Sequence, residues 1–135
     1  MGGNNYVLIT GVDIIEIERV KIIAKKYGDR FLKRIYTPSE RKYCRGRAPQ
    51  LASRFAAKEA TMKALGTGVR GVGWKDIEIK REKGKAPYIQ LHGRALNRAK
   101  TIELSELALS LSHSKDFAVA SVVGTSIKGN ILPRN

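Results

Sequence analysis

The sequence contains one cysteine, few acidic residues and no long run of apolar residues. A single cysteine, Cys44, cannot form an intrachain disulfide or a zinc cluster, so we expect a reducing compartment, the cytoplasm. No apolar run approaches the roughly 20 residues that a membrane-spanning helix needs, and the first residues lack the basic and apolar segments of a signal peptide. We therefore expect a globular protein without a membrane span.

Acidic residues are scarce relative to basic ones, with 12 Asp and Glu against 26 Lys and Arg and a formal net charge of +14. Fourteen of the basic residues but only three of the acids lie between Arg19 and Lys63. This local excess predicts an anionic partner, which could be nucleic acid, a phosphate-rich small molecule or an acidic protein. Against nucleic acid, the basic stretch has few interleaved aromatic residues and no recognition motif.

The pattern of apolar residues and turn signals predicts one α+β domain in this chain of 135 residues. We expect strands at 6–12, 76–81, 88–91, 107–111 and 117–123, and helices at 16–26, 30–35, 37–44, 50–65 and 93–102. This order is not a regular βαβ alternation, which indicates helices packed on a mainly antiparallel sheet. We expect the domain to span residues 1–124, and the polar segment 125–135 to be a flexible tail.

Two acidic residues each allow a structural and a functional interpretation. Asp13 follows Gly11-Val12, where we expect the first strand to end, so it could cap the next helix or ligate a hard cation such as Mg²⁺. Glu59 is the only acid on its predicted helix. It could form an ion pair with Lys63 one turn later, or hold a metal beside a phosphate that Lys63 neutralises.

Two further motifs leave both interpretations open. Residues 66–71, GTGVRG, match the fingerprint G-x-G-x-x-G, but a helix precedes them and a strand follows, so we reject a Rossmann site. Gly66 and Gly68 could end the helix or bring backbone N–H groups to a phosphate. His113 could be an exposed histidine at a strand end or donate to a phosphate, and no elbow motif supports a Ser-His hydrolase.

In this order the motifs resemble the 4′-phosphopantetheinyl transferase family, in its small, single-lobe bacterial form. The resemblance covers about residues 6–124 and rests on six segments: Gly11-Val12-Asp13 with Glu16 and Arg19, FLKRIYTPSE at 31–40, RFAAKEATMKALGTG at 54–68, Asp76-Ile77-Glu78-Ile79, Pro87-Tyr88, and Leu111-Ser112-His113-Ser114. Lys85-Ala86-Pro87 departs from the adjacent Lys-Pro that is usual in the family.

The resemblance implies an enzyme of fatty acid biosynthesis that moves the phosphopantetheine arm of coenzyme A to a serine of an apo acyl carrier protein and leaves adenosine 3′,5′-bisphosphate. It also implies that Asp13 and Glu59 bind Mg²⁺, which would bridge the coenzyme A pyrophosphate. Lys63 is then placed to stabilise the leaving phosphate, and the serine proton goes to Glu59 or to a metal-bound water. Family members of this size are typically trimers with sites between subunits, so one side of each site would come from a neighbouring chain.

The remaining candidate residues are assigned to the two substrates. The candidates for contacts to coenzyme A are Arg54, Lys63, Gly66, Gly68, His113 and Ser114. The candidates for docking the carrier protein, which is typically acidic, are Arg19, Lys26 and Arg30. No nucleic acid is expected as a partner.

Overall fold

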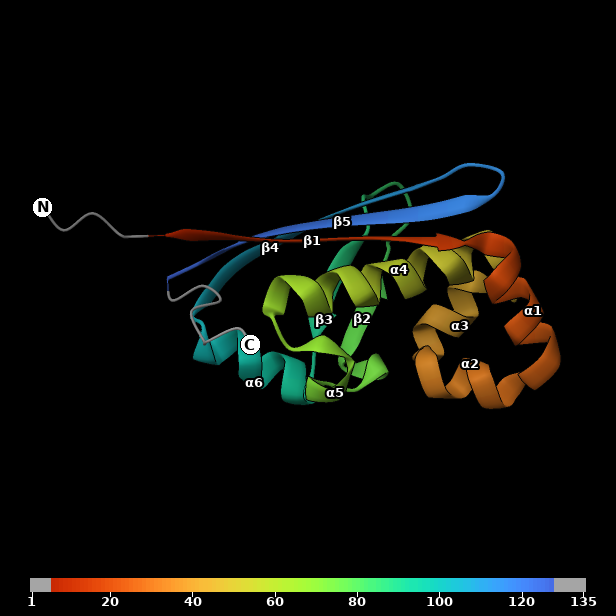
Figure 1. The fold of residues 1–135 in the computed structure, drawn as a ribbon, viewed down its shortest axis with the longest axis horizontal. Coiled ribbons are helices and arrows are strands. Elements are labelled where there is room, and N and C mark those ends of the chain that lie inside the picture. Colours follow the sequence, from red (N-terminus) through yellow and green to blue (C-terminus); the bar gives the residue numbers. More distant parts are fainter. Residues whose placement is uncertain (1–5, 128–135) are drawn as a thin grey trace, which may run out of the picture.

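A computed structural model describes residues 6–127 of the chain and confirms the α+β fold (Figure 1). Its elements are β1 (Val7–Glu16), α1 (Ile17–Tyr27), α2 (Asp29–Ile35), α3 (Pro38–Cys44), α4 (Ala48–Leu65), α5 (Gly68–Gly71), the 3₁₀ helix η1 (Trp74–Asp76), β2 (Ile77–Lys80), β3 (Tyr88–Leu91), α6 (Gly93–Thr101), β4 (Leu104–His113) and β5 (Phe117–Ser126). The order is the predicted one, with α5 and η1 added in the glycine-rich segment. Within residues 6–127, no helix has the length and apolar composition to cross a membrane.

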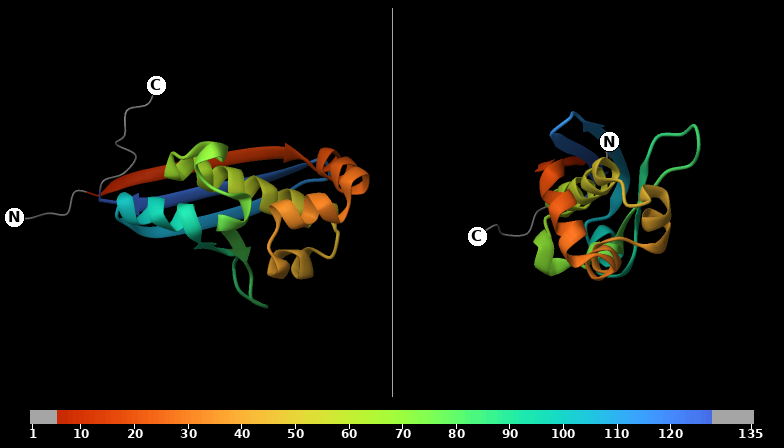
Figure 2. Two further views of the ribbon diagram at one scale, coloured as in Figure 1. Left: turned by 90° about the horizontal axis from the view of Figure 1, so that it is seen from below. Right: turned by 90° about the vertical axis from the view of Figure 1, so that its right-hand side faces the viewer.

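The main sheet consists of three antiparallel strands in the order β1-β5-β4. Side chains alternate between its two faces, and inward-facing residues such as Ile9 and Val122 are buried. Helix α4 lies along this inner face, as Figures 1 and 2 show. Strands β2 and β3 form a second antiparallel sheet, and β2 also contacts α4. Helix α4 is therefore enclosed by both sheets.

Helix α4 can approach the main sheet closely because its buried face carries small side chains. Ala52, Ala56, Ala60 and Ala64 are all buried, and alanine also has the highest helix propensity. One apolar cluster fills the space between α4 and the two sheets, and a second lies between α4 and helices α1–α3. The two clusters meet along α4, so one helix organises the whole core.

Helices α1, α2 and α3 gather at the end of the molecule where β1 ends (Figure 1). Helix α3 begins with a capping box, in which Thr37 accepts from the Glu40 N–H and Glu40 accepts from the Thr37 N–H. The hydroxyl of Tyr36 donates to the carbonyl oxygen of Leu51 at 2.7 Å. This bond ties the start of α3 to the first half of α4.

Several predicted boundaries are wrong, and one of them changes the interpretation of Asp13. Strand β1 continues to Glu16 because it pairs with β5 along its whole length, up to Phe117. Asp13 therefore lies inside a strand and does not cap α1, whose N-cap position is Glu16. Strand β5 continues through residues 125 and 126, the first two residues of the predicted tail, while the part of that tail from residue 128 lies outside the described residues.

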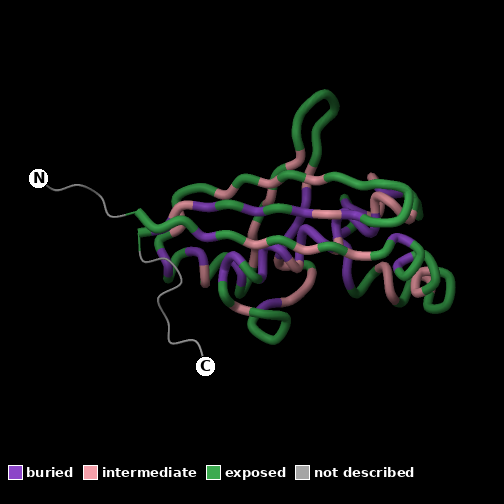
Figure 3. The backbone as a smooth tube through the Cα atoms, turned by 45° about the horizontal axis from the view of Figure 1, so that its top comes forward, coloured by how far each residue is buried: buried purple, intermediate pink, exposed green. Residues whose placement is uncertain are grey.

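The outer face of the main sheet carries exposed apolar side chains. Leu8, Val12 and Ile14 of β1 are 69%, 59% and 61% exposed, and Val123 of β5 lies on the same face. Figures 1 and 3 show that the described helices all lie on the other side of the sheet. A patch of this kind on a small domain indicates contact with another molecule.

Candidate active site

Asp13 and Glu59, which are 46 positions apart in the sequence, line one cavity of about 340 Å³. Strand β1 contributes Asp13, helix α4 contributes Glu59, and helix α1 contributes Arg19. Phe31 of α2 and Phe55 of α4 complete the apolar part of the lining. The structure thus brings together the two carboxylates and one of the cations that the sequence analysis singled out.

The distance between β1 and α4 depends on Gly11. A Cβ added at this position would lie 1.8 Å from the carbonyl oxygen of Ala60 and 2.9 Å from the backbone nitrogen of Ala64. The two backbones are therefore in direct contact, which only glycine permits. Asp13 follows two residues later and points to the same side of the strand. The close contact at Gly11 therefore sets how near Asp13 comes to α4.

Lys63 links the strand to the helix. Its ammonium group donates to the carbonyl oxygen of Val12 at 3.0 Å and to Asp13 Oδ1 at 3.3 Å. Among the ion pairs of the described residues, Lys63 is paired with Asp13 and not with Glu59. Its side chain is more than half exposed, so the pair contributes little to stability. The ammonium group is therefore accessible to an anion entering from solvent.

The two carboxylates place negative charge in a partly buried cavity. Burial raises the pKa of Glu59, the charge of Asp13 raises it further, and Lys63 and Arg19 lower it. A cation held by both carboxylates would turn their repulsion into attraction. Mg²⁺ prefers such oxygen ligands and completes its shell with water and substrate phosphates. Among residues 6–127, no group of three or more His, Cys, Asp or Glu side chains could hold a metal. Asp13 and Glu59 could supply two oxygen ligands to an ion that takes the rest of its shell from water and a substrate.

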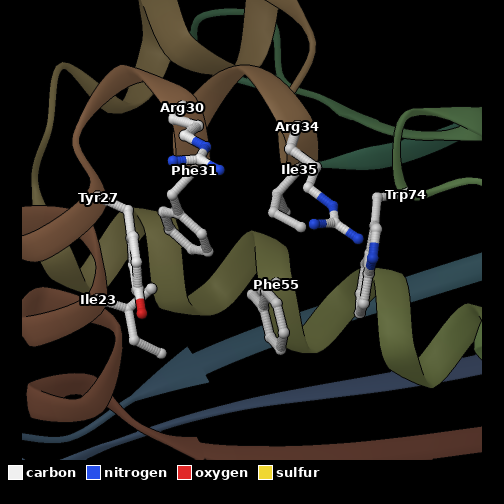
Figure 4. Close-up of a pocket in the computed structure, with 8 residues that line it drawn as sticks. All are labelled: Ile23, Tyr27, Arg30, Phe31, Arg34, Ile35, Phe55 and Trp74. Carbon is white, nitrogen blue, oxygen red and sulfur yellow. The ribbon is translucent and has the colours of Figure 1, made fainter.

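A second cavity, of about 380 Å³, lies beside the first and shares apolar lining with it (Figure 4). The side chains common to both are Ile23, Phe31 and Phe55. Trp74 stacks on Phe55 with their ring centroids 4.9 Å apart, and Tyr27 lies on the opposite side. Arg30 and Arg34 of α2 stand along its edge. We call this cavity the apolar groove; it leads to the cavity of Asp13 and Glu59 and has a cationic rim.

The predicted coenzyme A contacts on or near α4 lie outside the cavity of Asp13 and Glu59. Arg54 is buried, with its guanidinium carbon 4.2 Å from the centroid of the Tyr43 ring. Its Nε has no hydrogen-bond partner among the described residues. Gly66 ends α4 with φ of 73°, and Gly68 has φ of 64°. The helix-ending interpretation of Gly66 is thus confirmed, because left-handed backbone at this position favours glycine.

His113 and Ser114 lie at the end of β4 and at the following turn. Ala118 of β5 pairs with His113 on one side and with Ile15 of β1 on the other, so two strand spacings, about 10 Å, separate His113 from β1. The hydroxyl of Ser114 accepts from the N–H groups of Asp116 and Phe117 inside the turn. Neither His113 nor Ser114 lines the cavity of Asp13 and Glu59.

Sequence reasoning missed two features around α4. Phe55 of α4 lines both cavities but is not among the predicted site residues, whereas Leu51, Met62 and Leu65 of the same helix are buried. Its position one turn before Glu59 is the signal that could have placed it at the site. We also missed that Lys58 is completely buried, for which the sequence carries no signal.

Comparisons with known proteins agree on one family. A family model described as the 4′-phosphopantetheinyl transferase superfamily matches residues 9–122. A holo-[acyl-carrier-protein] synthase of Koribacter versatilis is 48% identical over 121 residues, which cover 87% of this chain and 97% of that protein. The crystal structure of the Helicobacter pylori holo-[acyl-carrier-protein] synthase in complex with coenzyme A matches with a TM-score of 0.78 and 33% identity, over 86% of this chain and 99% of that one. A Bacillus anthracis holo-(acyl-carrier-protein) synthase in complex with CoA (3′,5′-ADP) matches with a TM-score of 0.70 and 38% identity, over 89% and 99% of the two chains.

Proposed function

The chain belongs to the 4′-phosphopantetheinyl transferase superfamily, and from that membership we propose its reaction. It transfers the 4′-phosphopantetheine group of coenzyme A to a serine of an apo acyl carrier protein and releases adenosine 3′,5′-bisphosphate. The observation that carries this proposal is that Asp13 and Glu59 line one cavity between β1 and α4, with the Lys63 ammonium group paired with Asp13. Two carboxylates and an accessible ammonium group suit a reaction at a pyrophosphate.

Asp13 and Glu59 would hold Mg²⁺ in this reaction. Mg²⁺ held by these two carboxylates would neutralise charge on the coenzyme A pyrophosphate. Two carboxylates are enough for this ion, because water and the substrate supply its other ligands. The two side chains come from strand β1 and from helix α4, both of which are regular elements of the fold.

The chain's own residues can orient the pyrophosphate and accept a proton. Lys63 projects from α4 with its ammonium group beside Asp13, where it would stabilise charge on the departing phosphate. Arg19 adds a second positive charge from α1. The serine hydroxyl of the carrier attacks the β-phosphorus in line with the departing oxygen. Glu59 is the chain's own candidate to accept the proton of that hydroxyl.

The carrier protein would dock over the apolar groove and its basic rim. Arg19 lines the cavity of Asp13 and Glu59, and Arg30 lines the groove beside it. Lys26 stands at the end of α1 with its ammonium 5.3 Å from the centroid of the Tyr27 ring. An acidic carrier would be attracted to these cations, and its apolar side chains would fill the groove. This use of the positive charge makes nucleic acid the less favoured partner.

The enzyme is proposed to be a homotrimer with its sites between subunits. The exposed apolar residues Leu8, Val12 and Ile14 would be covered by two further copies of the chain. Within one chain, His113 and Ser114 lie away from Asp13. In a trimer, a neighbouring copy would supply these two residues as contacts to coenzyme A. Light scattering should give three times the chain mass of 15.0 kDa, and a monomer at working concentrations would contradict this part.

We further propose that the enzyme is cytoplasmic and acts in fatty acid biosynthesis. Cys44 is a buried free thiol, which is compatible with a reducing compartment. The carrier protein of fatty acid biosynthesis is therefore the first substrate to test.

Mass spectrometry of the carrier tests the reaction directly. The protein is mixed with coenzyme A, Mg²⁺ and an apo carrier, and the carrier should gain the mass of one phosphopantetheine group. Asp13→Ala and Glu59→Ala should abolish the transfer without lowering the melting temperature, because each removes one of two repelling charges. Glu82→Ala, which removes an exposed acid that pairs with Lys85, is the matched control and should stay active. Absence of any adduct with the wild-type protein would reject the proposal, and activity in both site variants would reject the metal assignment.

A further inference from the structure

Lys58 is the residue immediately before Glu59 and is completely buried. Its ammonium group is 2.9 Å from Glu40 Oε1 and donates to the carbonyl oxygen of Trp74 at 3.0 Å. It also donates to the carbonyl oxygen of Ile77. All three ammonium protons therefore have acceptors, which a buried lysine requires. Neither the proposed reaction nor the docking of the carrier uses this side chain directly.

Glu40, the partner of Lys58, is equally well fixed. Its Oε1 also accepts from the Thr37 N–H at 2.8 Å, and its Oε2 accepts from the Ile79 N–H at 2.8 Å. These bonds attach Glu40 to the start of α3 and to β2. The pair of Lys58 and Glu40 thus connects α4 with α3, η1 and β2, three elements that do not line the cavity of Asp13 and Glu59.

A buried ion pair of this kind is weak evidence for a stabilising role. Removing two charges from water costs about as much as their attraction returns, and an apolar pair of similar volume is often as stable. Such a pair does fix the relative orientation of the elements that it joins, because its hydrogen bonds form in only one arrangement. Here it fixes the orientation of α4, and this affects the residues on both sides of that helix.

Lys58 and Glu59 point to different sides of α4, since successive residues of a helix with 3.6 residues per turn are turned by about 100°. With the Lys58 side chain bonded to η1 and β2, the rotation of α4 about its axis is set, and Glu59 faces β1 and Asp13. The same ammonium group holds the Trp74 carbonyl and so the indole that stacks on Phe55 in the apolar groove. The buried Lys58 ammonium group therefore contacts the backbone of Trp74 in the apolar groove, and Lys58 directly precedes Glu59 in the sequence.

We propose that Lys58 is a positioning residue: its bonds to Glu40, Trp74 and Ile77 set the rotation of α4, and thereby the place of Glu59 opposite Asp13 and of Trp74 in the groove. The part that concerns Glu59 rests on the proposed function. The part that concerns Trp74 does not, because it can be measured without any substrate.

The test compares Lys58→Met with a variant that loses stability elsewhere. Ile102→Ala removes buried side-chain volume at the far end of the core from Asp13, and it serves as the control with a similar fall in melting temperature. Both are assayed well below their melting temperatures. We expect Lys58→Met to lower kcat about tenfold or more and to raise the Mg²⁺ concentration for half-maximal rate, while Ile102→Ala keeps the wild-type kcat. Lys58→Arg, which retains the charge and the donors, should recover part of the loss.

Fluorescence supplies the measurement that is independent of activity. Trp74 is the single tryptophan of the chain, so the emission spectrum reports on the groove alone. Lys58→Met should shift that spectrum and make Trp74 easier to quench by acrylamide, whereas Ile102→Ala should leave both unchanged. If Lys58→Met does not fold, the double variant with Glu40→Gln avoids an unpaired buried charge and is expected to show the same two effects.

The outcomes separate this inference from the proposed function. Loss of transfer in the wild-type protein would reject the function, and the spectra would still decide the part about Trp74. Wild-type kcat and an unshifted spectrum in folded Lys58→Met, or an equal loss of kcat in Ile102→Ala, would reduce Lys58 to a stabilising residue and overturn the inference.

Discussion

Gly11→Ala should separate the two elements that carry the carboxylates. The added Cβ would lie 1.8 Å from the Ala60 carbonyl oxygen, whereas real Cβ atoms essentially never approach another heavy atom closer than 3.0 Å. Both colliding groups belong to backbone, so no side-chain rotation relieves the contact. Strand β1 and helix α4 must move apart by about 1 Å, a displacement that can lower turnover about 100-fold.

The same substitution should cost stability. Overpacking a well-packed interior typically costs about 1–3 kcal/mol. We expect the upper end of that range, because β1 is held on its other side by ten residue pairs with β5 and cannot move freely. For a domain of this size, that corresponds to a fall in melting temperature of roughly 10 °C. Purified Gly11→Ala should therefore be folded at room temperature but nearly inactive.

Gly124→Ala is the matched control for this experiment. Its Cβ would lie 2.8 Å from the carbonyl oxygen of Glu106, again a backbone collision in the main sheet. Gly124 pairs with Ile9, four residues along β1 from Asp13, and the collision is with β4 rather than with α4. We expect a smaller loss of melting temperature, because this collision is much milder than the one at Gly11, with kcat preserved. Near-normal kcat in Gly11→Ala, or an equal loss in Gly124→Ala, would refute the role given to the close contact.

Three further measurements test a cation of the docking surface, a buried carboxylate and a buried thiol. Arg30→Glu should raise the KM for an acidic carrier at least about fivefold at low salt, and the difference from the wild-type KM should shrink as salt rises. Lys100→Glu on α6 is the control and should leave the KM unchanged. Equal effects of the two substitutions would remove Arg30 from the docking surface. Burial acts to raise the pKa of Glu78, but hydrogen bonds from two hydroxyls and from His92 lower it to about 2. Its contribution to stability is therefore complete above about pH 4.5 and is lost as the pH falls toward 2. Denaturation with urea should show roughly 1–2 kcal/mol of this loss in the wild-type protein and not in Glu78→Gln; equal pH dependence in both proteins would contradict it. Burial raises the pKa of Cys44 to about 11, so iodoacetamide at pH 8 should modify it only in urea, and rapid modification of the folded protein would show that the thiol is accessible.

Local signals predicted the elements that depend on neighbouring residues. The helix expected at 37–44 begins at Pro38, directly after the capping box of Thr37 and Glu40, and the strands expected at 76–81 and 88–91 are present as β2 and β3. Strand ends were less predictable, because β1 and β5 extend as far as they can pair. The alternation of apolar residues does not show where a partner strand stops, which is why Asp13 was expected at a strand end and lies inside β1.

The chemical groups of the protein can be listed from its sequence: it is basic with few acids, and two of those acids stand in motifs that resemble one family. Where these groups meet depends on the fold. The contact of Gly11 with Ala60 brings Asp13 to the cavity of Glu59, and Lys63 pairs with Asp13 across that contact instead of with Glu59 on its own helix. The fold also buries Lys58, one charged residue among many in the sequence, where it connects α4 with neighbouring elements. Such arrangements depend on which backbones can approach one another, and that is a property of the packed fold rather than of any segment.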